Sequence, residues 1–410
     1  MSSYLATFGT LFTVVAATVL AWAGGRIARW FGHPPVVGEL VMGIALGPSV
    51  LGALVPGVAL TVFDPSAVRA IDHVSRYAIL VFMFFVGLEL DTAVLRRHAR
   101  GVARIGTFSL LVPFSLGCTL ALCLYASQRG DVSNELAFVL FVGIAMSITA
   151  MPVLTRILAD WNMVRTTIGT IAIGCAAIDD IVAWTMLGVI DGLVRGHAHG
   201  ASMFAGVVAY LVVMLFVIRP ALARVAAIRT RAFGRVIWLV VVAGVTVASV
   251  IATEYIGIHA VFGAFLAGAC VPRYPDVLEG LEKPLRVASS LVLPAFFVLI
   301  GLRTEIASLD GATSWAIAAA ILVCACAGKL GGSALAAKTL GFAWRDALAI
   351  GGLLNTRGMV ELVALDLGRS LGILSPALFT MFVIMTLVTT LATVPILRRL
   401  GLRPIAPAPT

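Results

Sequence analysis

The sequence has few charged residues for its length: Lys, Arg, Asp and Glu make up 12% of its 410 residues. Soluble domains carry roughly 25% charged residues, whereas 60% of this chain is hydrophobic. So little charge cannot cover the surface of a soluble fold of this size. The scarcity excludes an ordinary soluble protein and favours one that crosses a membrane many times. We therefore interpret the net charge of +9 as basic loops, and expect no nucleic-acid partner.

Several familiar signals are also missing. None of the six cysteines forms a CxxC motif and all lie in apolar surroundings, so we expect no metal site or disulfide. The segment 4–30 has no basic region or cleavage site before its apolar run, which favours a membrane span over a signal peptide. We predict one transmembrane domain over 1–403, a short cytoplasmic tail over 404–410 without a regulatory domain, and no cofactor.

Long apolar runs, by contrast, are abundant. A helix needs about 20 apolar residues to cross the hydrocarbon core. That length predicts an all-α polytopic membrane protein of about thirteen transmembrane helices, at 4–30, 35–53, 70–90, 105–126, 136–157, 166–190, 203–218, 236–253, 256–271, 286–302, 312–337, 344–366 and 374–397. Only Tyr255-Ile256-Gly257 separates the eighth span from the ninth, so an even count stays open.

The basic residues predict the orientation. If the N-terminus lies outside, most of the 29 lysines and arginines fall in cytoplasmic loops, as the positive-inside rule requires. Thirteen spans then place the C-terminus in the cytoplasm.

Two patterns recur seven spans apart. Residues 82–88 and 296–302 both read F-x4-G-L, and polar or glycine-rich interruptions break the fifth span at 147–152 and the twelfth at 351–358. An odd offset reverses the orientation, so the repeat is inverted. Matching interruptions in the two halves are typical of a transporter site near the membrane midplane, although two ordinary kinked helices are the alternative.

Charged residues inside the spans are rare and therefore informative. Asp179 and Asp180 lie near the middle of the sixth span, where each charge costs about 2.5–3.5 kcal/mol. Neighbouring helix residues point about 100° apart, so the two carboxylates face different surroundings. Lys329 in the eleventh span also needs a partner, because a lone buried ammonium is equally costly.

Four further charged residues have two interpretations each. Arg357 and Glu361 are spaced i, i+4 and share one helix face, where they either hold the broken helix together or take part in transport directly. Glu39 in the second span and Glu89 at the end of the third either line an access path for ions or lie at the membrane interface.

These residues resemble the monovalent cation/proton antiporter family, in its branch of bacterial sodium/proton and potassium/proton exchangers. The Asp179-Asp180 pair and Lys329 are similar to that family's aspartate pair and membrane-embedded lysine. The stretches 38–48 and 352–362, the latter with LNTRGMVEL at 354–362, are also similar to family motifs. The likeness covers essentially the whole chain.

The resemblance implies two crossing broken helices within interleaved core and dimerisation subdomains of a homodimer. It implies that Asp180 binds the cation and the proton, that Asp179 pairs with Lys329, and that Thr149 lies at the crossing. The chain departs from many relatives, which have an aspartate after the threonine, because Ala150 follows here. This departure puts sodium selectivity in doubt.

The function implied is secondary active transport in the bacterial inner (plasma) membrane, not enzymatic catalysis. A monovalent cation, Na+ or K+, would exchange for protons by alternating access and serve pH homeostasis, with no metal beyond the transported cation. A carrier for an organic ion or secondary metabolite on the same fold is the strongest alternative. A channel fits one deep charged site poorly, and an intramembrane aspartyl protease needs carboxylates from two different helices.

Overall fold

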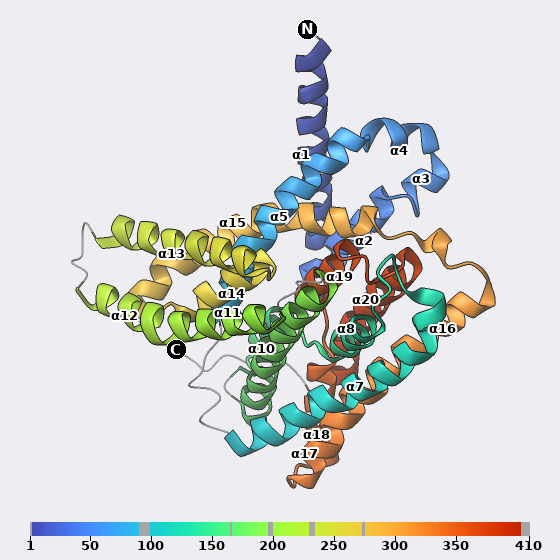
Figure 1. Cartoon of the computed structure of the whole chain (residues 1–410). Coiled ribbons are helices and arrows are strands. Elements are labelled where there is room, and N and C mark those ends of the chain that lie inside the picture. The colour runs from blue at the N-terminus through green and yellow to red at the C-terminus, as the bar shows by residue number, and fades with distance from the viewer. Residues whose placement is uncertain are drawn as a thin grey trace. The chain divides into compact units, whose positions relative to one another are not determined.

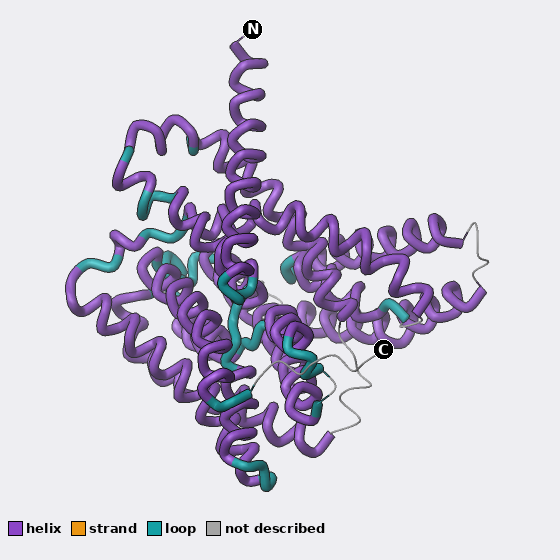
Figure 2. Tube along the Cα trace, turned by 180° about the vertical axis from the view of Figure 1, so that it is seen from behind, coloured by secondary structure: helices purple, strands orange, loops and turns teal. Residues whose placement is uncertain are grey.

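The computed structural model describes residues 2–89, 99–164, 166–195, 200–228, 234–272 and 275–402. Within these ranges the chain is helical and has no strand, only an isolated bridge between Arg129 and Leu374 (Figure 2). The tail predicted at 404–410 lies outside them. The all-helical prediction is therefore confirmed for the part of the chain that is described.

The helices of the first half are labelled in Figure 1. They are α1 (Ser2–Trp30), α2 (Pro35–Leu46), α3 (Leu51–Leu54), α4 (Pro56–Val62), α5 (Pro65–Glu89), α7 (Ala99–Gln128), α8 (Glu135–Ser147), α9 (Met151–Asp160) and α10 (Thr167–Arg195). The second half contains α11 (Gly200–Val212), the π-helix η1 (Val213–Ile218), α12 (Arg219–Ile228), α13 (Gly234–Ile256), α14 (Ala260–Cys270), α15 (Pro275–Leu302), the 3-10 helix η2 (Ile306–Ser308), α16 (Gly311–Cys326), the π-helix η3 (Ala327–Gly331), α17 (Gly332–Thr339), α18 (Trp344–Leu354), α19 (Met359–Ser370) and α20 (Pro376–Arg399).

Every predicted span has a helical counterpart, but not all of them are long enough to cross a membrane. Among the described residues, 11 helices are long and apolar enough to cross a membrane. Counting the bent pair α18–α19 as one span raises the number to 12. The segment predicted at 256–271 is α14, which has only 11 residues. A helix of that length rises about 16 Å, roughly half of the hydrocarbon thickness. The ninth predicted span is thus a short helix after the turn at Gly257 (φ 95°).

The chain divides into two compact units. One comprises residues 1–14, 66–90 and 188–296, and the other comprises 15–65, 91–187 and 297–410. The second unit contains every candidate site residue except Glu89. Glu89 is the last residue of α5 in the first unit, and its side chain lies outside what the structure describes.

Hydroxyl hydrogen bonds join three helices in the first unit. Ser249 of α13 donates to the carbonyl oxygen of Gly263 on α14 at 2.7 Å, and its Oγ lies 2.6 Å from the hydroxyl of Tyr210 on α11. All three groups are away from water, so these bonds satisfy polar atoms that would otherwise be costly to bury. A helix as short as α14 is only marginally stable by itself, so its stability depends on contacts with the neighbouring helices such as these.

In the second unit, small residues let helices approach closely around the two interrupted spans. A Cβ added to Gly117 on α7 would lie 2.9 Å from the Cα of Gly143 on α8. Any side chain at that position would force α7 and α8 apart. Such small-residue contacts are the usual way in which membrane helices pack tightly. The packing brings α7 beside the first broken span.

Candidate functional site

The two interrupted spans break where the sequence predicts and meet at their breaks. The first span ends its helix α8 at Ser147 and resumes as α9 at Met151, with Pro152 in the first turn of α9. The second ends α18 at Leu354 and resumes as α19 at Met359, after Gly358 with φ 156°. Proline cannot continue a helix from the preceding turn, and glycine tolerates a positive φ. Local sequence therefore explains both interruptions.

Hydrogen bonds cross from one break to the other. The backbone N–H of Ala150 donates to the carbonyl oxygen of Thr356 at 2.9 Å, and Thr149 Oγ1 lies 2.8 Å from the carbonyl oxygen of Leu354. Unwound backbone inside a membrane must find such partners because no water is available in the hydrocarbon. The crossing of two broken helices is thus present in this chain.

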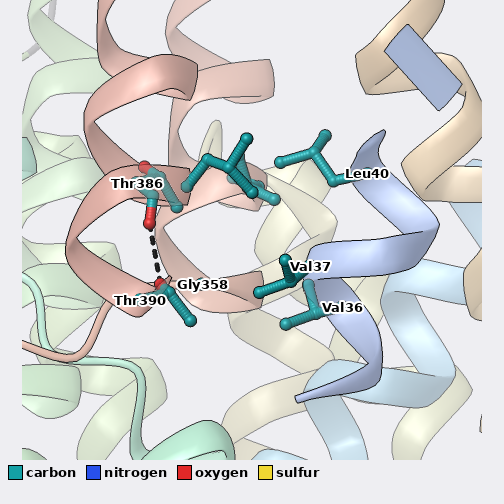
Figure 3. A pocket seen from close by; sticks show the side chains of 8 residues that line it. Val36, Val37, Leu40, Gly358, Thr386 and Thr390 are labelled. Carbon is teal, nitrogen blue, oxygen red and sulfur yellow. Dashed lines mark hydrogen bonds between the residues drawn. The ribbon is translucent and has the colours of Figure 1, made fainter. Parts of the chain in front are cut away.

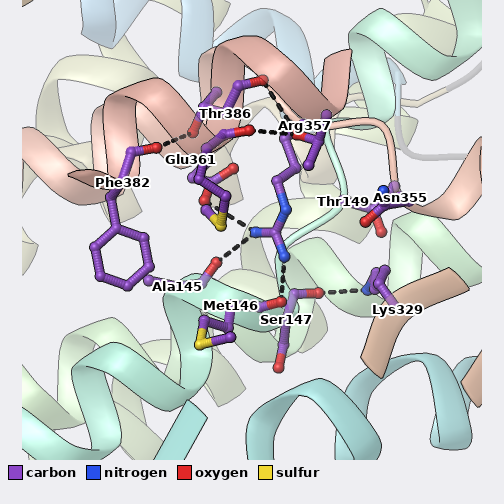
Figure 4. A network of polar contacts seen from close by, with 12 residues as sticks. Ala145, Met146, Ser147, Thr149, Lys329, Asn355, Arg357, Glu361, Phe382 and Thr386 are labelled. Atoms are coloured by element: carbon purple, nitrogen blue, oxygen red, sulfur yellow. Dashed lines mark hydrogen bonds and ion pairs between the residues drawn. The ribbon is translucent and has the colours of Figure 1, made fainter. Parts of the chain in front are cut away.

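Asp179 and Lys329 form a fully buried ion pair at this crossing. Lys329 Nζ lies 2.6 Å from Asp179 Oδ2, and the two side chains are 0% and 1% exposed. The ammonium also donates to the carbonyl oxygen of Ser147, the last residue of α8 (Figure 4). A helix C-terminus carries partial negative charge, so the end of α8 and the carboxylate of Asp179 both stabilise the charge of Lys329.

Thr149 connects this ion pair to the second broken span. Its Oγ1 lies 2.8 Å from Asp179 Oδ2 as well as 2.8 Å from the Leu354 carbonyl oxygen. A hydroxyl has one proton to donate, so the two acceptors compete for it. Asp179 therefore lies within hydrogen-bonding distance of both Lys329 and Thr149, the two other site residues named from the sequence.

Asp180 is equally buried but faces elsewhere. It follows Asp179 on α10 and is 0% exposed. The helix turns its side chain about 100° from that of Asp179, and Lys329 pairs with Asp179 rather than with it. The two carboxylates thus occupy different surroundings.

Lys329 lies in a π-helical segment that the sequence pattern does not predict. The segment η3 spans Ala327–Gly331 between the regular helices α16 and α17. A π-helix widens one turn by an extra residue and is frequent at functional sites. Lys329 lies within this widened turn and is buried.

Arg357 supports the same crossing from the other side. It lies 2.9 Å from Glu361, and both side chains are 0% exposed. Its guanidinium also donates to the carbonyl oxygens of Ala145, at 2.8 Å, and of Met146 (Figure 4). These are carbonyls in the last turn of α8, which lack partners within their own helix. The contacts fit the interpretation that this pair holds the broken helices together.

The last helix, α20, supplies hydroxyls that the sequence reading missed. Thr390 donates to the carbonyl oxygen of Arg357 at 2.6 Å, and Thr393 lies 3.0 Å from Thr356. Buried threonines recur along one side of α20 at a helical spacing, at Thr386, Thr389, Thr390 and Thr393. That spacing, within an otherwise apolar span, was the available signal.

A small pocket adjoins the second break. It lies between α2 and α20 next to Gly358 (Figure 3). The residues that line it are Val36, Val37, Leu40, Gly358, Leu362, Thr386, Leu387 and Thr390. Its walls are mostly apolar, with two threonines.

Glu39 does not line this pocket. It lies on α2, where its carboxylate packs against Gly25 of α1; a Cβ at Gly25 would lie 2.7 Å from Glu39 Oε1. Whether Glu39 serves as an access path stays a prediction.

Comparison with known proteins gives a consistent set of matches. The family model described as "Sodium/hydrogen exchanger, transmembrane" matches residues 14–399. The Na(+)/H(+) antiporter NhaS4 of Synechocystis sp. is 35% identical over 395 residues, which cover 94% of this chain and 95% of that protein.

Longer relatives match over part of their length. The K(+)/H(+) antiporter 1 of Saccharomyces cerevisiae is 31% identical and Cation/H(+) antiporter 17 of Arabidopsis thaliana is 34% identical; each match covers 89% of this chain. The chain spans only 43% and 45% of their respective lengths.

A solved structure shows the fold alone. The sodium proton antiporter MjNhaP1 from Methanocaldococcus jannaschii superposes with a TM-score of 0.63 at 14% identity, covering 96% of this chain and 99% of that one.

Proposed function

The chain belongs to the sodium/hydrogen exchanger family and is a monovalent cation/proton antiporter, and we propose that Asp180 is the carboxylate at which the cation and the proton compete. The observation that carries this proposal is its complete burial next to a crossing of two broken helices. Asp179 is already paired with Lys329 at 2.6 Å. In this proposal Asp179 balances the charge of Lys329, and Asp180 takes the exchanging ions.

Electrostatics makes such a site an exchanger without ATP or covalent chemistry. A bare carboxylate in a low-dielectric environment is strongly disfavoured. A carboxylate that holds a proton or a cation is neutral, so only the loaded site crosses the barrier. The proton and the cation then move in opposite directions because each must leave before the other binds.

The other buried groups hold the site in position in this proposal. Arg357 and Glu361 fix the end of α8, and Thr149 joins Asp179 to the second broken span. Lys329 compensates the charge of Asp179. Movement of the cation toward Asp179 would release Lys329, which ties the lysine to the transport cycle.

The setting of the protein is also part of the proposal. We propose a homodimer in the bacterial plasma membrane, with the N-terminus outside and the C-terminus in the cytoplasm. The basic ends of α1, with Arg26 and Arg29, and of α20, with Arg398 and Arg399, support this orientation by the positive-inside rule.

The decisive experiment replaces Asp180 by Asn, which keeps the shape and removes the charge. Purified protein in liposomes should lose cation-dependent proton flux, measured with Na+, K+ and Li+ separately. Asp160→Asn is the matched control, since Asp160 is 61% exposed and pairs only with Arg156 on the same helix turn within the described residues. Normal exchange by a folded Asp180→Asn protein would reject the assignment.

A further inference from the structure

One polar side chain at the crossing has an oxygen that the network leaves unused. Asn355 follows the last residue of α18 and is 2% exposed. Its Nδ2 donates to Cys326 Sγ at 3.5 Å, while Oδ1 accepts no hydrogen bond from any group in the described ranges. A buried amide oxygen without a donor costs about 1–3 kcal/mol of stability. A polar residue at this position therefore needs a functional explanation.

The backbone places this side chain beside the proposed ion site. The carbonyl of the preceding residue, Leu354, lies 2.8 Å from Thr149 Oγ1, and the carbonyl of the following residue accepts from Ala150. Figure 4 labels Asn355 and Thr149 in the same network of polar contacts. The Asn355 amide also donates to Cys326, three residues before Lys329 in the chain, so Asn355 connects the second break to the segment that carries the lysine.

The oxygen atoms gathered there are mostly neutral. Thr149 contributes a hydroxyl and Leu354 a backbone carbonyl, while Ala150 contributes no side-chain oxygen. Asp179 also has an oxygen, Oδ1, that accepts no hydrogen bond within the described parts of the chain. Alkali cations bind through such rings of oxygen dipoles, whose number and strength set the selectivity.

We propose that Oδ1 of Asn355 is a ligand of the transported cation. This inference rests on the proposed function, because it requires the cation to reach the crossing beside Asp179 and Asp180. The amide carbonyl is a weaker electrostatic ligand than a carboxylate. It stabilises a smaller, strongly hydrated ion such as Na+ less than an aspartate would, and so contributes to discrimination between Na+ and K+.

The test measures cation selectivity in proteoliposomes by proton flux at varied Na+ and K+. Asn355→Leu keeps the approximate volume and removes the oxygen, so the apparent KM for the cation should rise about tenfold, the effect of about 1.4 kcal/mol. Asn355→Asp adds charge, so the ratio of KM for K+ to KM for Na+ should rise by a similar factor. Asn134→Asp is the matched control, because Asn134 caps α8 and Asp caps a helix equally well.

The experiment distinguishes failure of antiport from failure of the Asn355 ligand. A wild-type protein without cation-dependent proton flux would overturn the proposed function and this inference with it. Wild-type exchange together with an unchanged KM in Asn355→Leu would overturn the role of Asn355 alone. If the leucine variant fails to fold, Asn355→Ala, which also removes the oxygen, is measured in its place. Protection from thermal unfolding by added K+ should also fall, since a ligand that binds the folded state stabilises it by RT ln(1 + [L]/Kd) and so less when its affinity is lower.

Discussion

Breaking the Asp179–Lys329 pair should destabilise the protein far more than breaking an exposed pair. Lys329→Ala leaves Asp179 Oδ2 with Thr149 as its hydrogen-bond partner among the described residues, and also deprives the Ser147 carbonyl of its donor. Asp179→Asn leaves a charged ammonium in the same buried place. Both side chains are almost fully inaccessible, so solvent cannot compensate either charge.

The expected size follows from that burial. Removing one partner of a buried ion pair costs about 3–5 kcal/mol, because the remaining charge is left uncompensated. Asp179→Asn combined with Lys329→Gln leaves no charge behind. Its loss in unfolding free energy should therefore be smaller than the sum of the single variants by about 1–3 kcal/mol.

The assay is reversible unfolding of the purified protein in mixed micelles, applied to both single variants and to the double variant. Arg156 and Asp160 provide the matched control cycle, since they lie 3.4 Å apart with side chains 49% and 61% exposed. Their coupling should not exceed about 0.5 kcal/mol. If the Asp179 and Lys329 effects also add to within about 0.5 kcal/mol, the two groups do not depend on each other and the reasoning fails.

Two further predictions concern transport and topology. If the cation and proton compete one for one at Asp180, the apparent KM for the cation should fall about tenfold per pH unit while the site is protonated, then level off once it is not; a KM that is constant through the acid and neutral range would contradict competition. With the native cysteines replaced, single cysteines at the exposed positions Asp131 and Arg399 should react with a membrane-impermeant reagent from outside and from the cytoplasm respectively. This outcome requires the segment that contains α14 to complete a crossing in addition to the 12 long spans, so labelling of both from one side would contradict the proposed orientation.

Much of the fold could be predicted because a membrane requires helices of a minimum length and a hydrogen bond for every backbone polar group. Apolar runs marked the helices, and Pro152 and Gly358 marked where two of them break. The length of α14 was overestimated, since apolar residues continue through the turn at Gly257 and hydropathy does not register a change of direction.

Contacts between distant segments were harder to predict. The i, i+4 spacing identified the pair of Arg357 with Glu361, but no local pattern indicates that Arg357 reaches the carbonyls of α8, more than 200 residues away. The π-helical turn around Lys329 was equally hidden. Its sequence, AGKLG, is compatible with an ordinary helix, and packing rather than propensity selects the wider turn.

The hydrogen bonds between the two breaks have a mechanical consequence. Ala150 to Thr356, Thr149 to Leu354 and Arg357 to Ala145 all link one broken span to the other. Releasing each buried bond without a replacement costs about 1–3 kcal/mol, so sliding one span past the other would forfeit several at once. The four half-helices α8, α9, α18 and α19 should accordingly move as one rigid body. The ion would then move together with the residues that bind it, and these residues would not shift relative to one another during transport.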